Sequence, residues 1–453
     1  MTLDLVIRGG RVVTAHEEFD ADVGVADGRI AAIGSALEGA REIDARGMLV
    51  LPGAIDGHVH MRTQRERDVY DDDWDSGTIA AAFGGVTTIV DQAQVEPGLT
   101  LGEGVERRLA EAEGRSLVDY GLHVNLREAE IGRLAELEGL KARGLPSVKL
   151  YMTYDGYRVP DDVILVAMQE VARLGGLVIV HAENDELIRE LTRQNELAGR
   201  TGVRANALAR PPELEGEAVH RALAMARYAG ARTLIFHVTA ADAIREIAAA
   251  KARGQEVYGE GCLAYMVIND EVLDDPVRSP AFDIGPPLRP EEHRLAQWAG
   301  LASGALDIIS TDHGPRRLIR NADGSTTFPP GASGIEVRLA IAHQIGVREG
   351  WFSRSRWVEL CCTAPADVFG LTRKGRILPG YDADLVVFDP ARRMRLSAAN
   401  LHSAIDHATY EDMEVEGFPV VTISRGEVLV EHGELRGQPG RGRFVERSYG
   451  DPR

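Results

Sequence analysis

Short apolar runs alternate with longer stretches of Ala, Glu, Arg and Leu at helical spacing through the middle of the chain. This alternation is typical of βαβ units, in which a helix follows each parallel strand and packs on the sheet. The candidate strands are residues 51–60, 86–92, 118–125, 147–151, 177–181, 233–237, 256–260 and 306–312. Eight such units favour a closed (β/α)8 barrel of the TIM type over an open doubly wound sheet. No glycine-rich phosphate-binding sequence follows the first strand, which argues against a dinucleotide-binding fold.

The two ends of the chain have a different pattern, with several short strands separated by turn residues. Residues 5–7 and 22–25 near the N-terminus have the same texture as residues 383–388 and 420–423 near the C-terminus. We therefore expect both ends to complete one small β-sandwich domain beside the barrel, so that the chain is of the α/β class. The expected boundaries are residues 1–52 and 377–443 for the β-domain, 53–376 for the barrel and 444–453 for a C-terminal tail.

The composition adds limits on location and partners. Of the 453 residues, 44% are hydrophobic and 27% are charged, and the formal net charge is −19. An acidic balance argues against non-specific nucleic-acid binding, which needs a basic surface. No apolar run approaches the roughly 20 residues of a membrane span, and no signal-peptide pattern is visible. Since the three cysteines also give no disulfide framework, we expect a cytoplasmic protein that binds neither nucleic acid nor membrane.

Six residues able to bind metal ions lie at or near the ends of the predicted barrel strands. They are His58, His60, Lys149, His181, His237 and Asp312. In a closed barrel the C-terminal ends of the strands meet on one face, where the active sites of this fold are found. We therefore expect these side chains to share one pocket.

The first two of these residues, His58 and His60, are separated by one residue, so both imidazoles should point to the same side of the strand. Neutral histidine nitrogens are common ligands of zinc and other transition metals. Such a pair is also found as surface or structural residues. Its position after residues 53–57, at the end of a buried strand, favours metal binding.

Lys149 lies between Val148 and Leu150 in a run that should be buried. Lysine is rarely buried without a specific reason. One interpretation is a side chain that extends along the barrel rim to reach solvent. The other is a desolvated amine of lowered pKa that reacts with carbon dioxide. The resulting carbamate is an anion able to bridge two cations.

His181, His237 and Asp312 each end an apolar strand. Either histidine alone would more often be a buried structural residue, but two at equivalent ends of neighbouring strands favour metal binding. Two metals ~3.5–4 Å apart would share a hydroxide nucleophile and polarise a scissile carbonyl. Asp312 would accept the proton of the hydroxide and pass it to the leaving nitrogen. By contrast, His123 and His313 are expected to be structural, with His313 facing away from Asp312.

Longer motifs accompany these residues. They are PGAIDGHVH at residues 52–60, GGVTT at 84–88, VKL at 148–150, HAEN at 181–184, HVT at 237–239, PPLR at 286–289, TDH at 311–313 and GYDADLV at 380–386. Together they cover nearly the whole chain and resemble the cyclic amidohydrolases of the amidohydrolase superfamily. That family includes hydantoinases, dihydropyrimidinases, allantoinases and dihydroorotases.

The resemblance implies two divalent metal ions, zinc with Mn²⁺ or Fe²⁺ as alternatives, bound by the six residues named above. It also implies that Lys149 is carbamylated and bridges the two ions. The expected activity is hydrolysis of the amide bond of a cyclic ureide or imide, in a homo-oligomer that is a tetramer or a dimer. Some relatives are non-catalytic scaffolds that have lost ligands, and the complete set here argues against that alternative. Related deaminases, which use one metal without a bridging lysine, are also disfavoured.

Five further residues are candidate substrate contacts, and they favour different branches of the family. Tyr154 matches the hydantoinase tyrosine that hydrogen-bonds the ring carbonyl and stabilises the oxyanion, the alternative being a packing residue. Arg62 matches the arginine with which dihydroorotases bind a substrate carboxylate. Gln94 and Arg316 stand where dihydroorotases have an asparagine and a histidine, so that carboxylate site is incomplete, and Gly285 replaces a serine of hydantoinases. We expect a hydantoinase or dihydropyrimidinase, with a dihydroorotase or allantoinase as the alternative.

Overall fold

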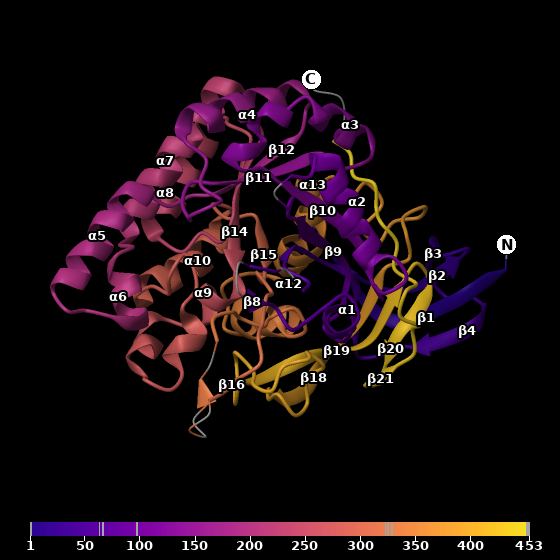
Figure 1. Cartoon of the computed structure of the whole chain (residues 1–453). Helices are drawn as coiled ribbons and strands as arrows, with labels where there is room; N and C mark the ends of the chain where they lie inside the picture. The colour runs from indigo at the N-terminus through magenta and orange to yellow at the C-terminus, as the bar shows by residue number, and fades with distance from the viewer. Residues whose placement is uncertain are drawn as a thin grey trace.

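A computed structural model describes residues 2–62, 64–65, 68–96, 98–321, 323, 326–327 and 329–449. Its centre is a parallel sheet of eight strands in the order β15-β14-β13-β12-β11-β10-β9-β6 (Figure 1). The strands are β6 (Ala54–Val59), β9 (Val86–Ala93), β10 (Asp119–Asn125), β11 (Ser147–Tyr151), β12 (Leu177–His181), β13 (Thr233–Ile235), β14 (Val257–Cys262) and β15 (Ile308–Ser310). The barrel closes where Val59 pairs with His313 and the His60 N–H donates to the His313 carbonyl at 2.8 Å. The predicted barrel is confirmed.

The first predicted strand, residues 51–60, differs from the structure because it is divided at Gly53. Its first part belongs to β5 (Leu49–Pro52) in the terminal sheet, and its second part is β6 in the barrel. The Gly53 N–H donates to the Asp384 carbonyl at 2.8 Å. A Cβ atom at Gly53 would lie 2.2 Å from Thr87 Oγ1, so only glycine fits where the chain crosses between the sheets.

Helices surround the barrel and join its strands (Figure 1). They are α1 (Ser76–Phe83), α2 (Leu101–Ala112), α3 (Glu136–Ala142), α4 (Asp161–Arg173), α5 (Asp185–Leu197), α6 (Gly202–Leu208), α7 (Pro212–Ala229), α8 (Ala241–Ala252), α9 (Leu263–Val267), α10 (Glu291–Ser303), α11 (Arg338–Ile341), α12 (Arg354–Val358) and α13 (Ala364–Phe369). Local sequence explains several ends: α2 starts with a capping box between Thr100 and Glu103, and α7 ends at the left-handed Gly230.

Both chain ends form one nine-stranded mixed sheet beside the barrel, in the order β21-β20-β19-β18-β5-β1-β2-β3 with β4 paired to β1 (Figure 1). Besides β5, its strands are β1 (Leu3–Val13), β2 (Glu18–Ala26), β3 (Arg29–Gly34), β4 (Gly39–Asp44), β18 (Leu385–Arg395), β19 (Glu414–Ser424), β20 (Glu427–Glu431) and β21 (Glu434–Leu435). The sheet has its own apolar core, to which Val12 and Ile30 contribute from one end and Val387 and Ile423 from the other. The predicted β-domain built from both termini is confirmed.

Buried charges join this β-domain to the barrel. Lys374 Nζ lies 2.6 Å from Asp119 Oδ2 at the start of β10 and 2.7 Å from Asp384 Oδ2 just before β18. The tail also packs on the barrel, because Phe444 pairs with Tyr120 and the buried Arg447 guanidinium donates to Ser147 Oγ at 2.9 Å. The two domains therefore share hydrogen-bonded and ionic contacts on the side of the barrel where its strands begin.

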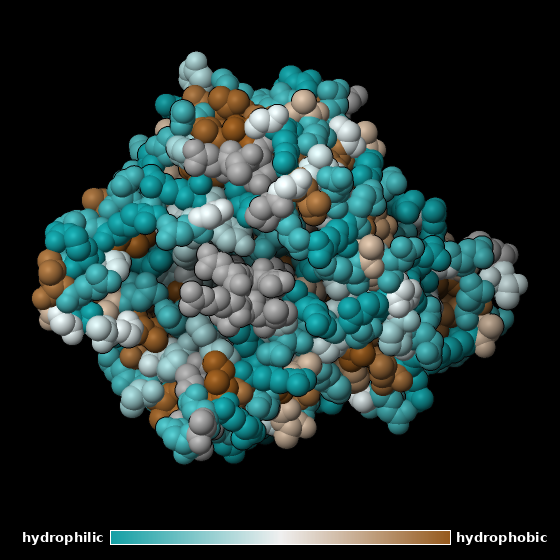
Figure 2. Space-filling model, viewed as in Figure 1, coloured by the Kyte–Doolittle hydropathy of each residue, from teal (hydrophilic) through white to brown (hydrophobic). Residues whose placement is uncertain are grey.

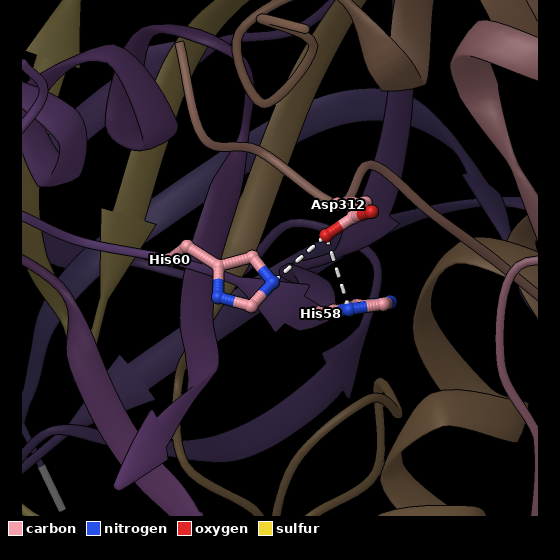
Figure 3. Close-up of side chains that lie close together, drawn as sticks. All are labelled: His58, His60 and Asp312. Atoms are coloured by element: carbon pink, nitrogen blue, oxygen red, sulfur yellow. Dashed lines mark ion pairs between the residues drawn. The ribbon is translucent and has the colours of Figure 1, made fainter. Parts of the chain in front are cut away.

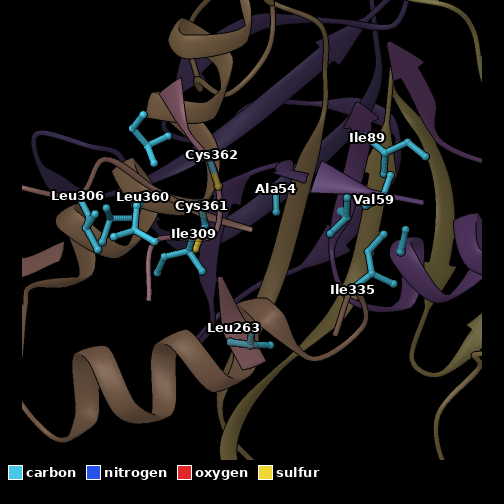
Figure 4. Packing of buried hydrophobic residues seen from close by; sticks show 14 of the residues in the cluster. Ala54, Val59, Ile89, Leu263, Leu306, Ile309, Ile335, Leu360, Cys361 and Cys362 are labelled. Carbon is cyan, nitrogen blue, oxygen red and sulfur yellow. The ribbon is translucent and has the colours of Figure 1, made fainter. Parts of the chain in front are cut away.

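The largest apolar core lies between the barrel, its helices and the β-domain (Figure 4). Ala54, Val59 and Ile335 belong to it together with Cys361 and Cys362, which act as small buried hydrophobic side chains. All three cysteines are buried and unpaired, as the sequence predicts. The face seen in Figure 2 is mainly hydrophilic, with small separate hydrophobic areas. Within the described residues, no helix is long and apolar enough to cross a membrane.

Candidate metal centre

His58 and His60 point from the end of β6 toward Asp312, which follows β15 (Figure 3). His58 Nε2 lies 3.1 Å and His60 Nε2 lies 2.8 Å from Asp312 Oδ1. One ligand atom from each of the three residues lies within 4.8 Å of the others, an arrangement that could hold a metal ion. The two histidines therefore share one side of the strand, as their spacing predicts.

The other three predicted ligands lie in the same buried site. His181 Nδ1 and His237 Nε2 are 2.9 Å apart. Lys149 is only 1% exposed, and its Nζ lies 3.9 Å from the centre of the Phe236 ring. That ring stacks on His58 with 3.8 Å between the ring centres. Since the rings of His58 and His237 are 5.5 Å apart, the structure brings all six residues together, and Lys149 does not reach solvent at the rim.

Four candidate site residues have positive φ angles, which residues with side chains rarely adopt. The angles are 43° at Arg62, 79° at Tyr154, 34° at His237 and 50° at Asp312. Such conformations cost about 1–3 kcal/mol each and persist only where the surrounding contacts hold them. The positions of Asp312 and His237 are therefore fixed by the barrel ends rather than by local preference.

The buried surroundings set the charge of these groups. Burial lowers the pKa of His237 well below its ordinary value, and the positive charges of His181 and Lys149 lower it further. Burial also lowers the pKa of His181, against the opposing effect of Glu183. Burial would raise the pKa of Asp312, but His58 and His60 hold it well below its usual range. Neutral imidazoles and an ionised carboxylate are the forms that bind metals.

Two buried glutamates that the sequence analysis did not identify hold the histidines in place. Glu260 in β14 accepts through Oε2 from His58 Nδ1 at 3.0 Å and from the His237 N–H at 2.6 Å. Glu183 Oε2 lies 2.8 Å from His181 Nε2 and 2.8 Å from Arg210 Nη1. Burial would raise the pKa of Glu183, but Arg210 and His181 lower it to about 2. Both glutamates could have been suspected, because Glu183 lies two residues after His181 and Glu260 ends a predicted strand.

A cavity of about 240 Å³ opens beside this centre, and Asp312 forms part of its wall. Among the predicted substrate contacts it includes Tyr154, Gly285 and Arg316. A Cβ atom at Gly285 would lie 1.8 Å from Tyr154 Oη, so the absence of a side chain makes room for the hydroxyl. Other wall residues are Tyr70, Arg210, Tyr265, Asp283 and Ala332.

Arg62 and Gln94 are not among the residues that form this wall. The Arg62 side chain is 63% exposed, and its Nη1 lies 3.9 Å from Asp73 Oδ2. Gln94 Oε1 accepts a hydrogen bond from the Tyr157 hydroxyl at 3.1 Å. The positive φ at Arg62 turns the chain after His60, and the sequence gives no sign of this turn.

The two histidines expected to be structural have buried hydrogen bonds. His123 contacts Ser147 Oγ at 2.7 Å and the Gly57 carbonyl at 3.0 Å. His313 Nε2 lies 3.0 Å from Asp72 Oδ2, and its Nδ1 accepts from the Gly334 N–H at 3.2 Å. His313 therefore faces Asp72 rather than the metal ligands.

Comparison with known proteins gives one consistent result. Residues 49–429 match the family model described as "Amidohydrolase family". The chain is 39% identical to the D-hydantoinase of Streptomyces coelicolor (strain ATCC BAA-471 / A3(2) / M145), with 99% of each chain covered. Two solved structures are similar: a D-hydantoinase from Bacillus sp. AR9, at 36% identity and TM-score 0.95, and a dihydropyrimidinase from Brevibacillus agri NCHU1002, at 36% identity and TM-score 0.93. They cover 99% and 98% of this chain, with 100% and 98% of their own length aligned.

Proposed function

The chain belongs to the amidohydrolase family, and from this we propose that it opens the amide bond of a five- or six-membered cyclic ureide or imide, as a hydantoinase or dihydropyrimidinase. One observation carries the proposal. Four histidines, a buried lysine and an aspartate converge at the strand ends of the barrel, beside a small cavity.

The donor atoms fit two divalent ions, most simply zinc, with Mn²⁺ or Fe²⁺ as alternatives. His58 and His60 would hold one ion through Nε2, and His181 Nδ1 and His237 Nε2 would hold the other. Asp312 would complete the first site. Bound divalent ions would polarise the scissile carbonyl and lower the pKa of the attacking water.

Carbamylation of Lys149 is supported by the charges around it. As an ammonium group, Lys149 lowers the pKa of His181 and His237 and would repel a cation bound between them. A carbamate would reverse the sign of this charge and place two oxygens among the histidines. A buried amine that has lost its proton is also the form that reacts with carbon dioxide.

Asp312 is the candidate general base and acid. Its carboxylate is 26% exposed because it faces the cavity, and its lowered pKa keeps it ionised at neutral pH. It would take a proton from the attacking water and deliver it to the leaving ring nitrogen.

Tyr154 is the candidate that stabilises the developing oxyanion, because its hydroxyl lies at the cavity wall beside Gly285. The backbone of Gly285 and the Arg316 side chain would complete the substrate contacts. Arg62 and Gln94 are not among the residues that line this cavity, and the Arg62 side chain lies beside Asp73 and is exposed. This weakens the dihydroorotase alternative, which depends on Arg62 to bind a carboxylate.

We also infer a homo-oligomer, a tetramer or dimer, in the cytoplasm. The buried free cysteines suit a reducing compartment. Light scattering on the purified protein measures the assembly state directly.

A substrate panel tests the proposed function. The metal-loaded protein should open hydantoin or dihydrouracil faster than allantoin or dihydroorotate, with ring opening followed by loss of ultraviolet absorbance. Preference for dihydroorotate or allantoin would support the alternative branch. Two bound metals with no ring opened would overturn the proposal, and a protein that binds no metal would be a scaffold.

A further inference from the structure

The connection between β18 and β19 leaves the β-domain and lies against the loops that surround the cavity. Its residues 402–409, called the C-terminal segment below, contact several of these loops. The contacts are Ser403 and Ala404 with Asp72, Asp406 with the Leu318 N–H, His407 with the Arg316 carbonyl and Thr409 with Ser333. Because Arg316 itself lines the cavity, the β-domain reaches the wall of the site through this segment.

Asp72 is the centre of these contacts and is fully buried. Its Oδ1 accepts from the Ala404 N–H at 2.7 Å and from the Ser76 hydroxyl at 2.8 Å. Its Oδ2 accepts from the Ser403 hydroxyl and from His313 Nε2, the latter at 3.0 Å. A buried carboxylate with four donors is rigid, since any other rotamer would leave a charged oxygen unsatisfied.

His313, which hydrogen-bonds Asp72, directly follows the metal ligand Asp312 and restricts its position. Its Nδ1 accepts the Gly334 N–H, so the proton of the neutral ring is on Nε2 and is donated to Asp72. On the other side of Asp312, Thr311 Oγ1 donates to the buried Asp56 Oδ2 at 2.7 Å. Asp312 lies between these two anchors with a φ of 50°, and its carboxylate points at His58 and His60 (Figure 3).

We propose that Asp72 and the C-terminal segment are positioning elements of the catalytic centre, which hold Asp312 in its left-handed conformation through His313. The inference rests on the proposed function and extends it: the β-domain supplies part of the active site. The segment 402–409 acts through the hydrogen bonds that Ser403 and Ala404 donate to Asp72.

The test compares Asp72→Asn with Asp75→Asn, the same chemical change three residues further on. Asp75 forms an ion pair with Arg115 and contacts neither His313 nor Ser403. In Asp72→Asn an amide NH2 replaces one of the two accepting oxygens, so it must face either the Ala404 N–H and the Ser76 hydroxyl or Ser403 and His313. Either way the four-donor arrangement that holds His313 beside Asp312 is broken. Outer residues that orient metal ligands typically contribute 10–100-fold to metal affinity or activity. We therefore expect Asp72→Asn to weaken zinc binding and lower kcat by at least about tenfold, with KM changed by less than about threefold.

The readout is zinc affinity from titration of the metal-free protein, together with kcat and KM of the zinc-loaded protein on hydantoin. The affinity measurement does not depend on activity, so it separates this inference from the proposed function. Wild-type protein that binds two zinc ions but opens no ring would reject the proposed function alone. Asp72→Asn with wild-type zinc affinity and kcat would overturn the positioning role.

Milder variants cover the case in which Asp72→Asn does not fold. Ser403→Ala removes one donor from the C-terminal segment and should lower zinc affinity in the same direction by a smaller factor. His313→Gln, whose amide can still donate toward Asp72, should retain more zinc affinity than His313→Ala. Equal zinc affinities in wild type and Ser403→Ala, or in the two His313 variants, would contradict the proposal.

Discussion

Gly285→Ala should disable the enzyme through Tyr154, although it adds only a methyl group. The new Cβ would lie 1.8 Å from Tyr154 Oη, whereas ordinary contacts begin near 3.4 Å, so the hydroxyl must move by about 1.6 Å (3.4 − 1.8). A hydrogen bond of roughly 2.7–2.8 Å to the oxyanion would then exceed 4 Å and be lost. Loss of one oxyanion donor costs about 2.7–4 kcal/mol, or a factor of roughly 10²–10³ in kcat.

A double-mutant cycle measures this coupling. Tyr154→Phe removes the hydroxyl and should lower kcat by the same factor of roughly 10²–10³. In the Tyr154→Phe background there is no hydroxyl for the new methyl group of Gly285→Ala to displace, so the double variant should have the same kcat as Tyr154→Phe alone. The effects of the two substitutions on kcat should therefore be far from additive. The assay is steady-state opening of hydantoin, with circular dichroism as the control for folding.

Two results would refute this reasoning. If Gly285→Ala keeps wild-type kcat, the hydroxyl is not needed where the structure places it. If the two substitutions lower kcat additively in the double variant, Gly285 acts independently of Tyr154.

Three further predictions concern the metal ligands and the fold. Lys149→Ala should bind less metal than wild type and lose at least about tenfold in kcat, as measured by metal analysis and the hydantoin assay. Unchanged metal content in this variant would exclude a bridging role for Lys149. Glu260→Gln weakens the acceptor for His58 Nδ1, so zinc affinity should fall by roughly 10–100-fold, and an unchanged affinity in zinc titration would contradict this orienting role. Burial lowers the pKa of His343 to about 4 in the folded protein, whereas a histidine in the unfolded chain has a pKa of about 6.5. As the pH drops from 6.5 to 4, the unfolded chain therefore binds a proton that the folded protein does not, and the free energy of unfolding falls by up to about 3 kcal/mol. The melting temperature should therefore fall less between pH 7 and pH 5 in His343→Gln than in wild type, and equal falls would contradict the assignment.

The sequence alone predicts the barrel and the six converging residues, because both follow from local rules. Strand ends can be read from the hydrophobic pattern, and parallel strands in a closed barrel must end on the same face. Lys149 was the most informative residue, since a lysine in a buried strand needs a reason, and its 1% exposure in the structure agrees.

Contacts between distant parts of the chain could not be predicted in this way. Glu260 meets His58 across 202 positions, and Ser403 meets Asp72 across 331. Nothing local indicates that a connection between two strands of the β-domain would reach the cavity. The positive φ at Arg62, which turns this side chain toward solvent, is likewise imposed by the tertiary structure.

The central claim is a centre of two metals bridged by a modified lysine. Anomalous diffraction from crystals of the zinc-loaded protein tests it most directly. We predict two zinc peaks, one beside His58 and His60 and one beside His181 and His237, with electron density for a carbamate on Lys149 between them. A single peak, or two peaks beside an unmodified Lys149, would contradict the account.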